Sequence, residues 1–308
     1  MKDDLYPSRS STQPRTYERK DPVFYGKGTS NCPISSQDLQ GYIENGVMVL
    51  EDMFSAEEVA SLQTAANSMR QNANTLQAET VVTEPSAERN DIVRSVFAIH
   101  QQSDVFANIA ASERLSDIAR FILNDDVYIH QSRLNYKPGF HGKEFYWHSD
   151  FETWHVEDGM PRMRALSMSV MLTDNHSQAG PTMFVSGSHN SFVSCTGETP
   201  DENYKKSLKK QEVGVPDADI LTHMVETGNI IAPTPPAGSV VIFDCNTMHG
   251  SNGNITPLER TNAFFVYNAW SNRLTTPYGG TKERPEFIAH RLVDRPLVAA
   301  SKKSIQAA

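Results

Sequence analysis

The sequence predicts a mainly β protein with flanking helices. From about residue 127 onward, short runs of β-branched and aromatic residues are separated by clusters of Gly, Pro, Asn and Asp, a pattern typical of strands joined by turns. Before that point, apolar residues recur at helical spacing. The candidate strands are 127–136, 144–151, 164–173, 181–185, 238–244 and 260–268. So many short strands indicate a sandwich, a jelly roll or a barrel.

The first part of the chain shows helix signals and one short strand. Residues 1–30 are polar, with scattered Pro, Ser, Arg and Lys, and we expect them to form a flexible N-terminal arm. Ser35 and Ser55 each precede apolar residues at helical spacing, and Ser55 opens a capping-box pattern. Residues 46–50 predict a strand between these two helices, and residues 104–123 predict another amphipathic helix.

The remainder is expected to form one domain over residues 31–308. Its helical part ends near residue 125, the β core covers about 126–270, and residues 271–308 form a C-terminal extension. A Lys- and Glu-rich insertion at about 196–229 interrupts the strand pattern. Such a segment is either a mobile lid over a site or a solvated surface excursion, and the second is the more frequent meaning.

Length, charge and cysteine usage exclude several classes of protein. With 308 residues, the chain can bury one substantial core. Its formal net charge of −9 argues against a nucleic-acid or anionic-membrane partner. No apolar run approaches the ~18 residues of a membrane span, and the N-terminus lacks an apolar signal core, so we expect a cytoplasmic protein. Three cysteines, far apart, argue against a disulfide framework or a thiolate zinc site.

The segment Phe145-Tyr146-Trp147-His148-Ser149-Asp150-Phe151 contains the strongest chemical signal. In an extended strand, residues two apart point to the same side, so His148 and Asp150 would converge. His155 and Glu157 have the same spacing, but they run into a predicted turn that offers no rigid frame. Two histidines and one carboxylate around a metal with open positions are typical of a non-haem Fe(II) oxygenase. We therefore expect His148 and Asp150 to be metal ligands.

A third ligand and an anion-binding residue are predicted downstream. His249 follows a strand-like run, and His189, in Gly187-Ser188-His189, is the weaker alternative because no Arg follows it at comparable spacing. A metal-bound 2-oxo acid leaves a distal carboxylate to be paired, and the planar fork of Arg260 is suited to it. Ser251 can add a hydroxyl donor. Each residue alone reads as ordinary surface, whereas the ordered set favours the metal site.

One strand carries a polar face. Gln131, Arg133, Asn135 and Lys137 alternate with apolar residues over 129–137. This is either a half-exposed strand or the wall of a pocket, in which Lys137 reaches a co-substrate carboxylate and Gln131 and Asn135 contact substrate. The pattern favours neither interpretation.

Three aromatic residues lie near the expected ligands in sequence or strand register. They are Trp154, Phe243 and Phe264. Aromatic residues at such positions are usually part of the core, but together they could also surround a cationic or flat substrate.

At these residues the chain resembles the phytanoyl-CoA dioxygenase superfamily of Fe(II)/2-oxoglutarate-dependent oxygenases, and within it the ectoine hydroxylases. The long stretch from Phe145 to Pro161 carries most of the resemblance, which extends over most of residues 30–290. It includes Asn135-Tyr136-Lys137-Pro138-Gly139 and His249-Gly250-Ser251-Asn252. A His-x-Asp…His pattern alone would indicate only the superfamily.

The resemblance implies a double-stranded β-helix core (jelly-roll, cupin-like) with flanking helices, usually as a homodimer. It implies iron held by His148, Asp150 and His249, and 2-oxoglutarate bound by Lys137 and Arg260 with help from Ser251. The implied contacts with ectoine are Gln131, Asn135, Trp154, Phe243 and Phe264. The implied reaction converts ectoine, O₂ and 2-oxoglutarate into 5-hydroxyectoine, succinate and CO₂, which yields a compatible solute for osmotic or heat stress.

Two alternatives remain. The nearest is hydroxylation of another small amino acid or related metabolite in the same superfamily. The other is a non-catalytic β domain that binds a metal or 2-oxoglutarate. The presence of all three ligands together with Arg260 argues against it.

Overall fold

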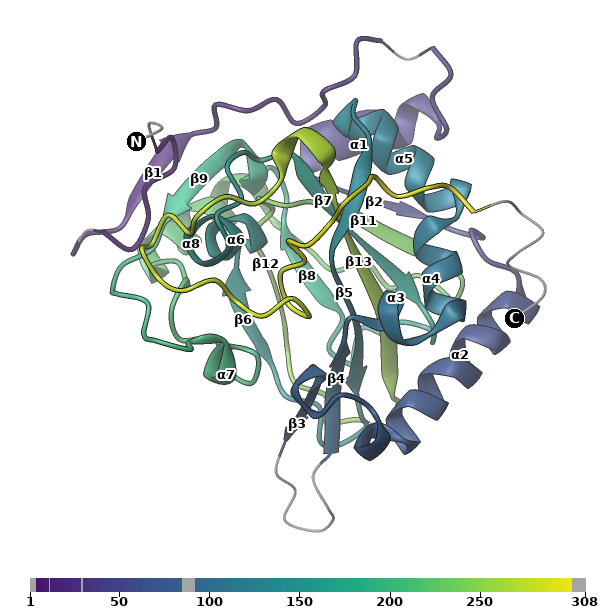
Figure 1. Ribbon diagram of the computed structural model, residues 1–308. Helices are drawn as coiled ribbons and strands as arrows, with labels where there is room; N and C mark the ends of the chain where they lie inside the picture. The colour runs from purple at the N-terminus through teal and green to yellow at the C-terminus, as the bar shows by residue number, and fades with distance from the viewer. Residues whose placement is uncertain (1–3, 11, 29, 85–91, 301–308) are drawn as a thin grey trace.

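The structure is a computed structural model that describes residues 4–10, 12–28, 30–84 and 92–300. It contains two antiparallel sheets (Figure 1). The larger sheet runs in the order β2 (Val47–Leu50), β11 (Val240–Asp244), β7 (Ala165–Met171), β13 (Arg260–Ala269), β5 (Val127–Lys137), β4 (Ile92–Phe97) and β3 (Val81–Glu84). The smaller sheet runs in the order β10 (Ile230–Ile231), β8 (Thr182–Val185), β12 (His249–Ser251) and β6 (Phe145–His148). A separate pair joins β1 (Arg15–Glu18) to β9 (Ser191–Ser194).

Successive strands alternate between the two sheets. The chain passes from β6 in the smaller sheet to β7 in the larger one and back to β8. It repeats this crossing from β11 through β12 to β13. Such alternation winds the chain into a double-stranded β-helix. The predicted fold class, a mainly β jelly roll with flanking helices, is confirmed.

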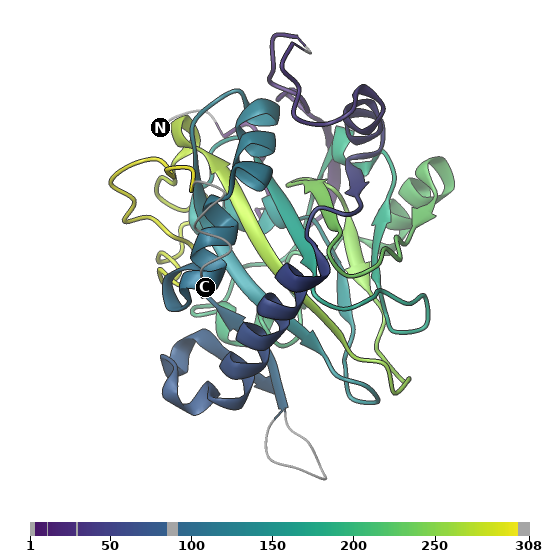
Figure 2. The same cartoon turned by 90° about the vertical axis from the view of Figure 1, so that its right-hand side faces the viewer.

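Helices flank the sheets. Those in the described residues are α1 (Ser36–Asn45), α2 (Ala56–Gln71), α3 (Ile99–Gln102), α4 (Asp104–Ala111), α5 (Glu113–Leu123), α6 (Asp150–Asp158), α7 (Tyr204–Ser207) and α8 (Ala218–Gly228), with 3₁₀ turns at Ala73–Thr75, Ala78–Thr80, Ser188–Asn190 and Trp270–Asn272. Figures 1 and 2 show α1, α2, α4 and α5 on the side of this sheet that faces away from β6, β8 and β12. Among the residues described, none of the helices is both long and apolar enough to span a bilayer.

Alternation along β13 separates the core from the site. Ala263, Phe265 and Tyr267 pack into the main apolar cluster with the covering helices. Phe264 and Val266 point to the other face and belong to two smaller clusters between the sheets. Since side chains alternate along a strand, the even-numbered positions of β13 face the interior of the jelly roll. The site therefore forms on a face that the aliphatic core does not occupy.

Two predicted elements differ from the structure. The single helix expected over 104–123 is broken at Ser112, whose extended backbone (φ −60°, ψ 141°) ends α4 and starts α5. The strand expected over 144–151 ends at His148, and Asp150 is the first residue of α6. The reason is local in both cases, because a serine in extended conformation followed by an acidic first turn favours a helix start.

The expectation of a flexible arm over residues 1–30 is wrong for the part that the structure describes. β1 pairs with β9 in the middle of this segment. Tyr6 is fully buried, and the side chains of Arg9 and Arg19 form buried ion pairs. Their partners lie far along the chain, and local composition does not reveal such contacts.

Candidate active site

Three ligand atoms meet where the smaller sheet joins α6. His148 ends β6, Asp150 begins α6 and His249 begins β12, with the two histidines directly paired across β6 and β12. Nε2 of His148 lies 3.6 Å from Oδ1 of Asp150, and Nε2 of His249 lies 3.9 Å from Oδ2. One ligand atom from each residue lies within 4.8 Å of the others. In the described ranges, no other group of three His, Cys, Asp or Glu residues has this geometry.

Hydrogen bonds fix which nitrogen of each imidazole carries the proton. Nδ1 of His148 lies 2.7 Å from the carbonyl oxygen of Tyr146, and Nδ1 of His249 lies 2.9 Å from that of Thr247. A carbonyl oxygen only accepts, so each Nδ1 donates and each Nε2 presents a lone pair. This is the arrangement that orients histidine ligands around metals. Two imidazole nitrogens and one carboxylate suit Fe(II).

The charge states of the ligands also suit a divalent cation. Burial lowers the pKa of His249 to about 4, and the neighbouring His148 adds to this effect. The ring is therefore neutral at pH 7, as metal binding requires. Burial alone would raise the pKa of Asp150, but His249, His148 and Arg133 outweigh it and hold the pKa below its usual range. Ser167 Oγ donates to Oδ2 of the Asp150 carboxylate at 3.3 Å.

The competing histidines lie elsewhere. His155 Nε2 is 2.9 Å from Oδ1 of Asp4, and its ring stacks on Tyr278 at 4.0 Å between centroids. Nε2 of His189 lies 3.0 Å from the carbonyl oxygen of Ile43. The segment of His155 and Glu157 belongs to helix α6 rather than to the predicted turn. The predicted turn is therefore wrong at these residues, but the preference for His148 and Asp150 agrees with the geometry.

Two buried cations bridge the open ends of the two sheets. Arg260 and Lys137 are cross-strand partners on the larger sheet, and Ser251 and Thr182 are partners on the smaller one. Lys137 Nζ donates to Ser251 Oγ at 2.8 Å, and Arg260 donates to Thr182 Oγ1 at 3.1 Å. Within the described residues, neither cation forms an ion pair with a carboxylate, and Nε of Arg260 has no hydrogen-bond partner.

The charge on these cations is costly without a counter-ion. Burial lowers the pKa of Lys137 to about 6, and the nearby Arg260 and Arg94 contribute. Burial also lowers the pKa of Arg260 to about 10. Buried charges in proteins are ordinarily paired, so two adjacent buried basic groups without a carboxylate partner indicate a site for an anion. Such a site is suited to the carboxylate of a small organic acid.

A pocket lies beside the metal ligands. It is lined by Ser95, Phe97, Gln131, Arg133, Phe145, His148, Asp150, Thr153, Trp154, Glu157, Ser207, Leu208, Gln211, Val213 and Arg284. Four of these residues, from Ser207 to Val213, belong to the charged insertion predicted at 196–229. That segment therefore contributes part of the wall, in addition to its exposed surface.

The predicted substrate residues divide into two groups. Gln131 and Trp154 line this pocket, and Gln131 Nε2 donates to the carbonyl oxygen of Ile288 at 2.7 Å. Asn135 is not among the lining residues, and its Oδ1 accepts from Ser95 at 2.8 Å. Phe243 and Phe264 are not among the lining residues and belong to a separate apolar cluster. The ring of Phe243 lies 5.0 Å from the imidazole of His249.

Several pocket residues were not predicted. Arg133 and Phe145 line the pocket, although the sequence did not settle whether either contacts a ligand. Arg133 shares the strand face of Gln131, which was the available signal. Arg284 and Phe97 come from segments with no recognisable motif, and only the folded chain brings them to the metal ligands.

Helix α6 is held in place by ion pairs with the N-terminal and C-terminal segments. Arg9 contacts Glu152 at 2.6 Å and Glu157 at 2.6 Å. Arg284 makes two hydrogen bonds to Asp158, of 2.7 and 2.6 Å. The helix that begins with Asp150 is thus tied both to the N-terminal segment and to the C-terminal one.

Comparison with known proteins identifies the family of this chain. A family model described as phytanoyl-CoA dioxygenase (PhyH) matches residues 42–262. The chain belongs to the phytanoyl-CoA dioxygenase family. Within the family, it is 57% identical to the ectoine dioxygenase of Sphingopyxis alaskensis, over 94% of this chain and 93% of that protein. It is 46% identical to the ectoine dioxygenase of Halomonas elongata, over 93% of this chain and 86% of that protein.

Solved structures of the family have the same fold. EctD from S. alaskensis, in a structure with 2-oxoglutarate and 5-hydroxyectoine, matches with a TM-score of 0.87 at 50% identity, over 97% of this chain and 98% of that one. The carbocyclase SnoK from nogalamycin biosynthesis matches with a TM-score of 0.59 at 18% identity, over 79% of this chain and 87% of that one. The second likeness concerns the fold alone.

Proposed function

We propose that this member of the family is an ectoine hydroxylase. It consumes ectoine, O₂ and 2-oxoglutarate and releases 5-hydroxyectoine, succinate and CO₂. The observation that carries the proposal is the joint presence of a His-Asp-His cluster and of two adjacent buried basic side chains, Lys137 and Arg260, that have no carboxylate partner among the described residues. Similarity to ectoine dioxygenases over nearly the whole chain supports this choice of substrate.

His148, Asp150 and His249 would hold Fe(II) on one side. Bound iron supplies the activation of O₂, coupled to the oxidative decarboxylation of 2-oxoglutarate. The protein contributes two imidazoles, each with Nδ1 hydrogen-bonded to a carbonyl oxygen, and an ionised carboxylate. With only three protein ligands, the site would leave room for small ligands on a bound ion.

Lys137 and Arg260 would bind the distal carboxylate of 2-oxoglutarate, with Ser251 as a further donor. Arg260 has an unused Nε–H, and Lys137 already contacts the Ser251 hydroxyl. The anion would offset the cost of burying both charges. Thr182, which contacts Arg260, joins the proposed set.

Ectoine would occupy the pocket beside the metal ligands. It carries a carboxylate and a delocalised amidinium, and the pocket offers groups for each. Gln131 and the face of Trp154 suit the planar ring, and the guanidinium group of Arg133, whose buried Nε has no hydrogen-bond partner, suits the carboxylate. For the remaining predicted contacts, we propose apolar contact from Phe243 and Phe264 at the His249 side. Contact from Asn135 stays a prediction.

Ectoine-dependent succinate release tests the proposal. Iron-loaded protein should release succinate when ectoine is added and yield a product heavier by one oxygen, as measured by mass spectrometry. Succinate release that depends on another small amino acid, but not on ectoine, would favour the alternative within the same chemical class.

His249→Ala is the matched variant for the metal site. It should abolish turnover and reduce the iron content of the purified protein, because one of three ligands is lost. The circular-dichroism spectrum should remain that of the wild type, since His249 lies at the start of a short strand outside the main apolar cluster. Wild-type iron content in this variant would show that the third ligand is misassigned.

We also propose that the enzyme acts as a homodimer in the cytoplasm, where its product protects against osmotic and heat stress. The three cysteines are all free thiols, which fits a reducing compartment. Light scattering coupled to size exclusion tests the dimer, and a monomer at micromolar concentration would contradict it.

A further inference from the structure

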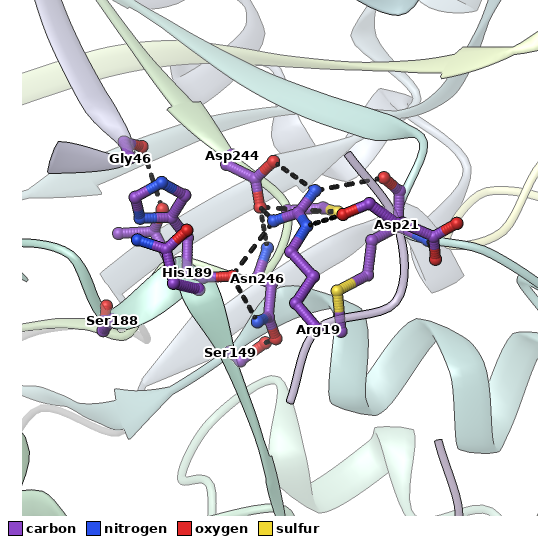
Figure 3. A network of polar contacts seen from close by, with 12 residues as sticks. Arg19, Asp21, Gly46, Ser149, Ser188, His189, Asp244 and Asn246 are labelled. Carbon is purple, nitrogen blue, oxygen red and sulfur yellow. Dashed lines mark hydrogen bonds and ion pairs between the residues drawn. The ribbon is translucent and has the colours of Figure 1, made fainter. Parts of the chain in front are cut away.

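A pair of buried side chains links the two segments that carry the metal ligands. Ser149 lies between His148 and Asp150, and its Oγ donates to Oδ1 of Asn246 at 3.1 Å. Asn246 belongs to the turn that leads into His249. Ser149 is 4% exposed and Asn246 is 2% exposed, so water does not compete for this contact. Figure 3 shows both residues within a larger polar network.

Ser149 occupies the N-cap position of α6 without capping the helix. Its backbone is extended (φ −103°, ψ 130°), as in an ordinary N-cap, but its side chain makes no capping hydrogen bond. A serine here usually accepts from a first-turn N–H. The Phe151 N–H instead donates to the carbonyl oxygen of Cys245 at 2.8 Å. The start of α6 is thus attached at two points to the turn before His249.

The orientation of the Asn246 amide is fixed by its other contacts. Nδ2 donates to the carbonyl oxygens of His189 and Ser191, both at 3.0 Å. Because these oxygens only accept, the nitrogen must face them and Oδ1 must face Ser149. The Asn246 backbone N–H donates to Oδ1 of Asp244 at 2.8 Å. One orientation of the Asn246 side chain therefore satisfies all of these hydrogen bonds.

An ion pair anchors the turn to the N-terminal segment. Arg19 donates to both carboxylate oxygens of Asp244, at 2.8 and 3.0 Å, and its side chain is 4% exposed. Arg19 also donates to the carbonyl oxygen of His189 at 3.1 Å. Figure 3 shows the resulting path from Arg19 through Asp244 and Asn246 to Ser149.

The backbone pairing of β6 and β12 is irregular next to the metal ligands. β6 and β12 pair at His148 and His249, but the register shifts between His249 and Ser251. A shift of this kind disrupts the ladder locally. The side-chain link therefore adds a constraint at the point where the backbone hydrogen bonds are irregular.

We propose that Ser149 and Asn246 are positioning residues for the iron site. They hold His148 and Asp150 at the spacing from His249 that one ion requires, and they touch neither the ion nor the substrate. The inference rests on the proposed iron site and extends it to residues outside the ligand set. Loss of such an outer contact ordinarily weakens metal binding about 10- to 100-fold.

Metal affinity of the full chain tests this role. Metal-free protein is titrated anaerobically with Fe(II), and Co(II) serves as a second probe because its visible absorption reports coordination. Ser149→Ala removes only one hydroxyl and should weaken binding of both ions by about 10- to 100-fold. Tyr267→Phe is the matched control, because it removes one buried hydrogen bond of 2.7 Å, to the carbonyl oxygen of Ala110, on the helix-covered face. The control should bind metal like the wild type.

The melting temperature of each metal-free variant separates positioning from stability. Similar losses in Ser149→Ala and Tyr267→Phe, with weaker metal binding only in Ser149→Ala, support the proposal. Asn246→Asp, which retains the size of the side chain but loses the amide donors, should weaken binding as well. Wild-type metal affinity in Ser149→Ala overturns the inference alone. A wild-type chain that binds neither ion overturns the proposed iron site itself.

Discussion

Arg9 and Arg260 are both buried, but their electrostatic surroundings are opposite. Arg9 contacts Glu152 and Glu157, each at 2.6 Å. Burial alone would lower the pKa of Arg9, but these two carboxylates raise it above its ordinary value. Arg260 contacts the hydroxyl of Thr182, and burial lowers its pKa to about 10.

This difference in pairing distinguishes a structural cation from one that can bind a ligand. A paired buried cation is already compensated, so it holds the surrounding elements together. An uncompensated one lowers the stability of the empty protein and gains most when an anion arrives. In this molecule, the first kind ties α6 to the N-terminal segment, and the second kind lies between the open ends of the two sheets.

We expect the largest effect when the buried ion pairs of Arg9 are removed. Arg9→Met leaves the buried carboxylate of Glu152 without a cationic partner and removes the 2.6 Å ion pair of Glu157, so it should lower the free energy of unfolding by about 3–5 kcal/mol. Urea denaturation measures this change. Arg15→Met, an exposed position of the same segment, should leave the free energy of unfolding unchanged. Equal, small effects of both substitutions would show that the N-terminal segment contributes little, as the sequence had indicated.

Arg260→Met should have the reverse profile. Its free energy of unfolding without ligand should equal or exceed that of the wild type, because an uncompensated charge is removed. Binding of 2-oxoglutarate should weaken by roughly 2–5 kcal/mol, while the requirement for ectoine changes less. Arg260→Lys retains the charge but not the planar fork, and it should lie between the two. Unchanged 2-oxoglutarate binding in Arg260→Met would reject an anion site at this position.

The smallest effect is a linkage between 2-oxoglutarate and protons at Lys137. The pKa of Lys137 is about 6 in the ligand-free protein, so the amine is mostly neutral at pH 8. A bound dianion favours the charged amine and raises this pKa, so binding takes up a proton and weakens as the pH rises above 6. Calorimetry in two buffers of different ionisation enthalpy measures the uptake. Lys137→Met should abolish it, and proton release in the wild type would contradict the assignment.

The sequence predicted the fold where the signals are local. For strands such as β5, β7 and β13, the predicted bounds agree with the structure within two residues. The break at Ser112 was missed, although Ser-Glu at that point is a helix-start signal. The strand pair β3 and β4 was also missed, because these short strands lie at the edge of the sheet and have no motif.

His148 and Asp150 were predicted as metal ligands because residues two apart in a strand point to the same side, but Asp150 is not in a strand. His148 and Asp150 do converge, but through a strand end and a helix start rather than one continuous strand. Lys137 and Arg260 lie on neighbouring strands, but the strand pattern left the role of Lys137 open, and only the family resemblance paired it with Arg260. Arg284 was not predicted, since it comes from an irregular segment far along the chain that local patterns do not connect to the pocket.

The contact between Arg19 and Asp244 closes a loop of 225 residues. Contacts of such long range form slowly, because chain entropy opposes the meeting of distant segments. The turn before His249 therefore acquires its final shape only after ribosomal synthesis has delivered most of the polypeptide. The cluster of His148, Asp150 and His249 can therefore assemble only after synthesis has passed His249, when both the N-terminal segment and this turn are available.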